Sequence, residues 1–263
     1  SDGPALDAVA LGLSRARSLP ELAREGGDGT ICLSLTTTEG VERVVFGEGG
    51  LHEGVSDDVL IIDFGTTGVP ATREFAERLN WVDAPVSGGQ VGAEAGNLSI
   101  MVGGTEEHFR RASPVLQVVG ANITHLGPAG SGQVTKLANQ LIVAQTIDAV
   151  AQALRMVELA GLDSAQVRKA LLGGFAESRI LQLQGDRMVR RDFEPGGTST
   201  LQLKDIRLAC ELAQSLGFSS PTLDNCLQQW EHFVGELGFG GLDHSGLFRI
   251  YEDSRDSTGA EPP

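Results

Sequence analysis

The pattern of apolar and polar residues changes near residue 130. Before that point, short apolar runs alternate with amphipathic segments. The predicted strands span residues 30–35, 59–64, 81–86, 98–102 and 122–126. The predicted helices between them span 19–24, 41–46, 70–79 and 106–118. Alternation of this kind indicates an α/β fold with a mainly parallel sheet.

After Gly127-Pro128-Ala129-Gly130 the strand signals stop and the pattern becomes helical throughout. Glycine and proline residues divide this part into helices at 132–160, 163–173, 178–191, 201–216, 221–236 and 243–251. The pattern therefore predicts an α/β domain over 1–129 and an all-helical domain over 130–252. The polar, Pro-ending segment 253–263 is predicted to be a disordered tail.

The longest predicted helix, 132–160, contains no proline or internal glycine and no charged residue between Lys136 and Asp148. We therefore expect it to be buried nearly all round. Lys136 lies in its first turns and has two interpretations. A buried ammonium at a helix start has a lowered pKa and suits proton chemistry. Alternatively, its aliphatic stem packs and its amine reaches solvent.

Composition narrows the classes of partner. Acidic residues outnumber basic ones 35 to 20, and the basic residues form no stripe, so we expect no nucleic acid partner. The spacing of the five histidines predicts no metal site. Cys32, Cys210 and Cys226 form no CxxC pair, which favours reduced thiols in a cytoplasmic protein. No apolar run approaches about 18 residues, so we expect no membrane span.

A Ser-Gly-Gly turn, Ser87-Gly88-Gly89, follows the predicted strand that contains Asp83. Ligands of open α/β sheets bind beyond the carboxyl ends of strands. Two adjacent glycines allow an anion to approach the backbone, and Ser87 adds a hydroxyl donor. The simpler interpretation is that this segment is only a turn.

Taken together, these segments resemble the β-hydroxyacid dehydrogenase family. The run 83–89, with glycines up to 104, resembles the family's substrate loop, and Gly130-Ser131-Gly132 with Lys136 and Asn139 resembles its catalytic-lysine motif. Lys204-Asp205 matches the pair that closes over the nicotinamide. Asp243-His244-Ser245 and the run 173–181 resemble the branch that reduces tartronate semialdehyde (2-hydroxy-3-oxopropionate).

The resemblance implies a role for each matching residue. Lys136 would be the general acid toward the carbonyl oxygen, and Asn139 or Gln140 would orient the substrate. The substrate carboxylate would be held by Ser87, Gly88 and Gly89. The cofactor, NAD or NADP, would be contacted by Leu35, Thr36, Thr66, Lys204 and Asp205.

The chain departs from the family pattern in two places. It contains no GxGxxG loop of the kind that binds the pyrophosphate, so about 35 to 40 residues of a typical member have no counterpart. We therefore expect the chain as written to bind the dinucleotide weakly or not at all. In Pro195-Gly196-Gly197, a glycine stands where relatives usually carry an aromatic residue.

The leading hypothesis is an NAD(P)-dependent reductase of a short, anionic 2-hydroxy-3-oxo acid. One alternative is a homologue that no longer binds dinucleotide and serves as an acid-binding or assembly protein. Another is a cofactor-independent lyase or isomerase that uses Lys136 alone. We also expect a homodimer or homotetramer, because the helical half is short for covering so long an apolar helix and the family pairs through it.

Overall fold

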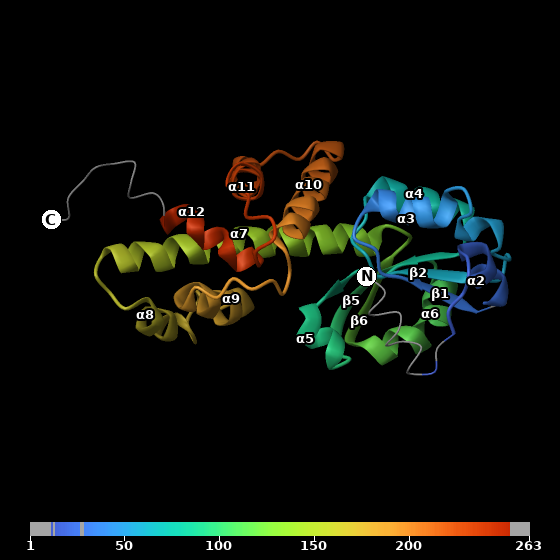
Figure 1. Cartoon of the computed structure of the whole chain (residues 1–263), viewed down its shortest axis with the longest axis horizontal. Helices are drawn as coiled ribbons and strands as arrows, with labels where there is room; N and C mark the ends of the chain where they lie inside the picture. The colour runs from blue at the N-terminus through green and yellow to red at the C-terminus, as the bar shows by residue number, and fades with distance from the viewer. Residues whose placement is uncertain (1–11, 13, 27–28, 253–263) are drawn as a thin grey trace. The chain divides into compact units, whose positions relative to one another are not determined.

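The computed structural model describes residues 12, 14–26 and 29–252, so the predicted tail 253–263 lies outside the described residues (Figure 1). The chain divides into two compact units. The first comprises Gly92–Gln133 and the described residues up to Gly88. The second comprises Gly89–Val91 and the described residues from Val134 onward.

The first unit is built on one six-stranded sheet in the order β1-β2-β3-β5-β4, with β6 beside β5. The strands are β1 (Thr30–Leu33), β2 (Leu60–Asp63), β3 (Trp81–Asp83), β4 (Val86–Ser87), β5 (Leu98–Gly103) and β6 (Gly120–Gly127). The pairs β1–β2, β2–β3 and β5–β6 are parallel, which confirms the predicted α/β sheet, whereas β5 runs antiparallel to β3 and β4. The predicted strand 81–86 is interrupted around Pro85, which has no N–H to donate.

The helices that precede the long helix are α2 (Leu19–Glu25), α3 (Thr38–Phe46), α4 (Val69–Arg78), α5 (Gly89–Glu94) and α6 (Glu106–Val119), with a 3₁₀ turn η1 (Leu51–Glu53). The hydroxyls of Ser18, Thr37 and Thr105 cap α2, α3 and α6 by accepting a backbone N–H of the first turn. The sequence missed α5, because glycine begins it and a turn was the simpler expectation.

Strand periodicity separates two cores in the first unit. Leu60 and Ile62 of β2 pack with Ala112 and Leu116 of α6. Ile61, which points to the opposite face, packs in a second core with residues of α2, α3 and α4. Figure 1 shows α3 and α4 over one face of the sheet and α6 over the other. Both faces of the sheet are therefore covered by helices.

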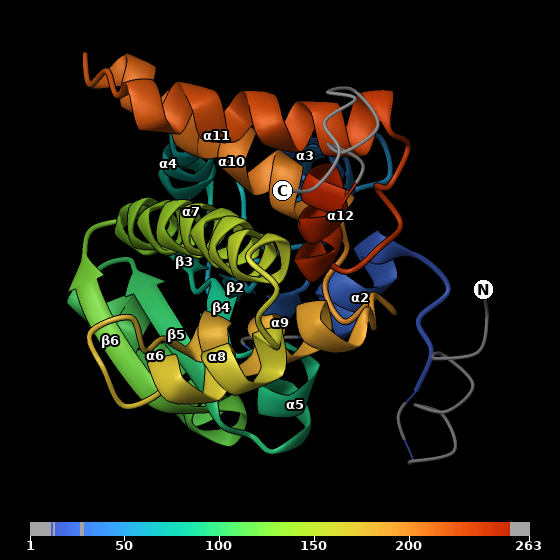
Figure 2. The ribbon, with the colours of Figure 1, turned by 90° about the vertical axis from the view of Figure 1, so that its left-hand side faces the viewer.

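The second unit is helical. It contains α7 (Ser131–Leu159, whose first residues belong to the first unit), α8 (Ser164–Leu171), α9 (Arg179–Arg190), α10 (Ser199–Ser215) and α11 (Pro221–Glu231), then a π-helical turn η2 (His232–Glu236), a 3₁₀ turn η3 (His244–Phe248) and α12 (Arg249–Glu252). Figure 2 shows α10 and α11 on one side of α7, and α8 and α9 on the other. Its core joins Ile147 and Leu154 of α7 to Met188, Ile206 and Trp230.

The prediction that the long helix is buried nearly all round is wrong for one stripe of α7. Ile142 and Met156 are 67% and 65% exposed. The exposed residues along this stripe carry no charge: Ala138, Ile142, Ala149, Gln152 and Met156. They follow one another at steps of three, four and seven residues, so they share one face of the helix. An uncharged exposed stripe is typical of a surface that packs against another protein.

None of the described helices has the length and hydropathy needed to cross a membrane.

We predict that the protein is a dimer or a larger oligomer that pairs through this stripe of α7, with well above ~1,000 Å² buried. The double variant Ile142→Glu, Met156→Glu should be monomeric, because it would bury two unpaired carboxylates in the interface. Light scattering at micromolar concentration measures the mass.

The control is Val118→Glu, which places one such charge on a residue of α6 that is 74% exposed in the first unit. It should leave the mass of the oligomer unchanged. A monomeric parent protein at micromolar concentration would contradict the prediction.

Candidate active site

The predicted cofactor residues of the first unit lie beyond the carboxyl ends of β1 and β2. These strands pair in register up to Leu33 and Asp63, and Phe64 N–H donates to the Leu33 carbonyl at 2.9 Å. The loops that follow therefore start side by side. We call Leu35, Thr36 and Thr66 the edge group. Leu35 and Thr66 are half-buried and Thr36 is exposed.

The neighbouring threonine, Thr67, has a different role from Thr66. Thr67 is fully buried, and its N–H donates to Gln133 Oε1 at 3.1 Å. Its hydroxyl donates to Asp63 Oδ2 at 3.3 Å and contacts the Thr72 hydroxyl at 2.9 Å. Thr67 thus holds the loop in place, whereas Thr66 keeps part of its surface accessible.

Asp83 and Gln133 hold the start of α7 against the sheet, a role that the sequence pattern did not predict for either residue. The buried Asp83 carboxylate accepts the N–H groups of Gly130 at 2.8 Å and Gln133 at 2.9 Å. Gln133 Nε2 donates to the Gly65 carbonyl at 2.9 Å. A Cβ at Gly132 would lie 2.4 Å from the Met101 carbonyl oxygen, so only glycine allows this approach. The sequence feature that could have indicated this role is the position of Asp83, an aspartate at the end of a buried strand.

Burial raises the pKa of Asp83, while the N–H groups of Gly130 and Gln133 oppose this by stabilising the carboxylate. The Asp83 side chain therefore acts as an acceptor for helix N–H groups, which would otherwise lack partners.

The Ser87-Gly88-Gly89 segment follows the short strand β4, where Ser87 pairs with Ser99 of β5. Gly88 and Gly89 have φ values of 140° and 63°, a region that favours glycine. Ser87 is half-buried and both glycines are exposed. The segment is therefore a specialised backbone turn at the end of a strand, as expected.

In the second unit the structure gathers five predicted residues into one group, which we call the lysine cluster: Lys136, Asn139, Gln140, Lys204 and Asp205. Lys136 Nζ donates to Gln140 Oε1 at 3.0 Å, and Asn139 Nδ2 donates to the same oxygen at 2.9 Å. Gln140 Nε2 donates to Asp205 Oδ2. Lys204 Nζ forms an ion pair with Asp205 Oδ1 at 2.9 Å. Both ends of the Gln140 amide are therefore used to link Lys136 with Asp205.

Lys136 is only 8% exposed, so it is a buried amine and does not reach far into solvent. Burial lowers the pKa of Lys136 because it disfavours the charged form. The Asp205 carboxylate opposes this and the Lys204 ammonium adds to it. The result is an amine that gives up its proton more readily than an exposed lysine.

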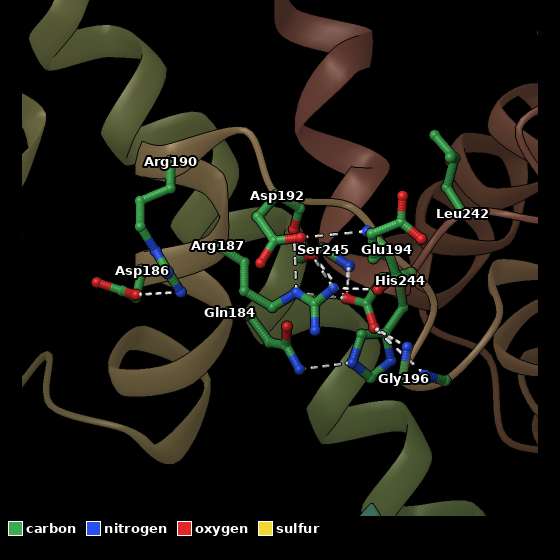
Figure 3. A network of polar contacts seen from close by, with 12 residues as sticks. Gln184, Asp186, Arg187, Arg190, Asp192, Glu194, Gly196, Leu242, His244 and Ser245 are labelled. Carbon is green, nitrogen blue, oxygen red and sulfur yellow. Dashed lines mark hydrogen bonds and ion pairs between the residues drawn. The ribbon is translucent and has the colours of Figure 1, made fainter.

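Asp243 joins the loop before α10 to the start of η3, and Figure 3 shows Gly196 and Ser245 of these two segments. Asp243 Oδ2 accepts the N–H groups of Gly196 at 3.1 Å and Gly197 at 3.3 Å. Its Oδ1 accepts from the Ser245 N–H at 2.9 Å and from the Ser245 hydroxyl at 2.6 Å. Burial, the largest single influence, raises the pKa of Asp243, but the charge of His244 and the hydrogen bonds from Ser245 and Gly196 together lower it. The described residues contain no cluster of three metal-ligating side chains.

Two family models match the chain. The NAD binding domain of 6-phosphogluconate dehydrogenase matches residues 3–127, and the NAD-binding domain of NADP-dependent 3-hydroxyisobutyrate dehydrogenase matches residues 130–251. The 2-hydroxy-3-oxopropionate reductase of Escherichia coli is 40% identical over 257 residues, which cover 95% of this chain and 87% of that protein. The NAD-dependent L-serine dehydrogenase of Pseudomonas aeruginosa is 30% identical, with 94% and 86% covered.

The structure of 3-hydroxyisobutyrate dehydrogenase from Mycobacterium tuberculosis, solved with L-serine, superposes with a TM-score of 0.82 at 30% identity, over 92% of this chain and 85% of that one. The chain therefore belongs to the β-hydroxyacid dehydrogenase family. It is an NAD(P)-dependent oxidoreductase, which confirms the leading hypothesis at this level.

The edge group fits a nicotinamide cofactor. The hydroxyls of Thr36 and Thr66 lie at the carboxyl edge of parallel strands, where dinucleotides bind in open α/β sheets. Threonine hydroxyls both donate and accept hydrogen bonds, as the ribose of a nicotinamide nucleotide requires. The expected weak binding by the chain as written stays a prediction.

We predict that Asp83→Asn destabilises the protein by about 1–3 kcal/mol. The carboxylate accepts hydrogen bonds from two backbone N–H groups, and in the variant the amide NH₂ would face one of these donors, which then loses its acceptor. Urea unfolding measures the change. Asp58→Asn, at an exposed aspartate of the same unit, should have little effect. Equal stability of the two variants would contradict the role given to Asp83.

A second prediction concerns the pH dependence of the lysine cluster. A general acid must be protonated, so kcat/KM for carbonyl reduction should fall as pH rises through the lowered pKa of Lys136. Asp205→Asn removes the negative charge that raises this pKa, so the alkaline fall should move to lower pH.

The profile of kcat/KM against pH measures the shift. Asp224→Asn, at an exposed aspartate of α11, is the control and should leave the profile in place. If kcat/KM of Asp205→Asn fell at the same pH as in the parent protein, or at a higher pH, the electrostatic coupling between Asp205 and Lys136 would be refuted.

Proposed function

We propose that this protein reduces a short 2-hydroxy-3-oxo acid, 2-hydroxy-3-oxopropionate, to glycerate with NADH or NADPH. The observation that carries the proposal is the buried amine of Lys136, linked through Gln140 to Asp205. The name of the Escherichia coli relative supports the choice of substrate.

The chemistry assigned to Lys136 follows from its surroundings. When bound, a reduced nicotinamide would supply the hydride that the carbonyl carbon accepts. Negative charge then develops on the carbonyl oxygen, and Lys136 Nζ donates its proton to that oxygen. Burial lowers the pKa of Lys136 and so favours the neutral amine that results, while the Asp205 carboxylate raises the same pKa and favours the protonated amine. In the reverse direction the neutral amine takes the hydroxyl proton as a base.

The remaining roles extend this proposal to single residues. Ser87, Gly88 and Gly89 hold the substrate carboxylate through the serine hydroxyl and backbone N–H groups. Asn139, which is half-buried one turn along α7, orients the substrate, and Gln140 orients the amine of Lys136. The cofactor is contacted by Leu35, Thr36, Thr66, Lys204 and Asp205.

We predict that Lys136→Ala lowers kcat by roughly 10²–10⁴, the usual effect of losing a positioned acid. Lys136→Arg should be nearly as poor, because a guanidinium does not release its proton near neutral pH. Initial rates on the full-length native protein, with 2-hydroxy-3-oxopropionate and saturating cofactor, measure both effects.

The control is Lys169→Ala, at an exposed lysine of α8, which should leave kcat unchanged. Circular dichroism checks the fold of each variant. If both Lys136 variants kept activity within a few-fold of the parent, the proposed mechanism would fail.

A further inference from the structure

His244 is a second polar side chain close to the lysine cluster, and the mechanism above gives it no role. It is the first residue of η3 and is half-buried. Its backbone N–H donates to the Gly197 carbonyl at 3.1 Å, and the preceding Asp243 holds the N–H groups of Gly196 and Gly197. The imidazole is therefore fixed to the loop that leads into α10, the helix that carries Lys204 and Asp205.

One edge of the His244 ring is held by α9. Gln184 Nε2 lies 2.7 Å from His244 Nε2, as Figure 3 shows. In this arrangement the amide donates, so Nε2 accepts and Nδ1 carries the ring proton. The ring thus has a fixed orientation and presents an N–H donor at its other nitrogen.

The Nδ1 edge of the ring faces Gly197. A Cβ at Gly197 would lie 3.9 Å from His244 Cε1 and 4.0 Å from Nδ1. These are ordinary contact distances, and Gly197 is not among the glycines with positive φ. Neither backbone conformation nor crowding therefore requires glycine here. Glycine leaves room here for one more atom in contact with the ring.

The charge environment links His244 to Lys136. Burial lowers the pKa of His244, Asp243 opposes this, and the positive charges of Arg187 and Lys136 lower it further. His244 is therefore neutral near pH 7 and lies within electrostatic reach of the Lys136 amine. A neutral imidazole N–H carries no positive charge that could offset the negative charge of a carboxylate. It is therefore better suited to bind an uncharged oxygen, such as that of a hydroxyl group.

We propose that His244 determines substrate specificity by donating a hydrogen bond from Nδ1 to the C2 hydroxyl of the substrate, in the space that Gly197 leaves open. This proposal rests on the proposed function, since the C2 hydroxyl is adjacent to the carbonyl group that Lys136 protonates. Gln184 is a positioning residue that fixes the ring. The site thereby favours 2-hydroxy-3-oxo acids over 3-oxo acids that lack the hydroxyl.

The test compares 2-hydroxy-3-oxopropionate with 3-oxopropionate, which differs only in the missing hydroxyl, on the full-length protein. His244→Phe keeps a planar ring and removes the donor. It should lower kcat/KM for the hydroxylated substrate about 10-fold, as expected for one lost hydrogen bond, and change kcat/KM for 3-oxopropionate less than two-fold. His244→Asn, which restores an N–H near the position of Nδ1, should recover part of the selectivity.

Gly197→Ala gives an independent test that leaves the histidine in place. The added methyl group fits against the ring without strain but occupies the space assigned to the hydroxyl. The same selective loss is expected. Gly235→Ala is the matched control, since a Cβ there meets no atom within 4 Å. If His244→Phe does not fold, as judged by circular dichroism, Gly197→Ala decides the outcome.

An equal loss on both substrates, or no loss, would overturn the assignment of His244. If 3-oxopropionate turns over too slowly to measure, its inhibition constant against the hydroxylated substrate replaces kcat/KM in the same comparison. Failure of the parent protein to reduce either acid would instead refute the proposed function. The two failures are therefore distinguishable.

Discussion

The hydrogen bonds from Gly130 and Gln133 to the Asp83 carboxylate are the constraint on which the candidate chemistry depends. They fix the first turn of α7 to the end of β3, where a helix start would otherwise leave N–H groups without partners. Gln133 adds a second attachment at the loop after β2. Lys136 lies one turn further along the same helix, so this attachment fixes where the helix that carries Lys136 begins. A general acid must be held in a fixed position relative to its substrate.

The lysine cluster balances opposing electrostatic effects. Burial lowers the pKa of Lys136, whereas direct pairing with a carboxylate would raise it and hold the proton more firmly. Gln140 separates Lys136 from Asp205 by one amide, and Asp205 also pairs with Lys204. The Asp205 carboxylate therefore raises the pKa of the amine against the effect of burial without forming a direct ion pair. This arrangement matches the pKa of the acid to its task.

Asp243 performs for the loop before α10 what Asp83 performs for α7. Each aspartate is almost fully buried, and both of its carboxylate oxygens accept hydrogen bonds. Both oxygens of Asp83 accept from a segment distant in sequence, whereas Asp243 accepts from the distant Gly196 through Oδ2 and from the neighbouring Ser245 through Oδ1. A buried carboxylate is costly unless its oxygens are satisfied, so each site specifies one backbone arrangement strongly. In both cases the fixed segment precedes a helix that carries residues of the lysine cluster. Two structural aspartates thus support residues that do the chemistry.

The sequence alone determined the alternation of strands and helices and the long helix that carries Lys136, while the other residues of the lysine cluster were identified through the family resemblance. Local periodicity and caps such as Ser18 and Thr37 specify these features without distant contacts. It could not show the exposed stripe of α7, the antiparallel pairing of β5, or the helix α5 that begins with glycine. Nor could it show that Gln140 links Lys136 to Asp205, or that Gly197 faces His244. These depend on contacts between residues tens of positions apart, and only tertiary packing decides which side chains meet.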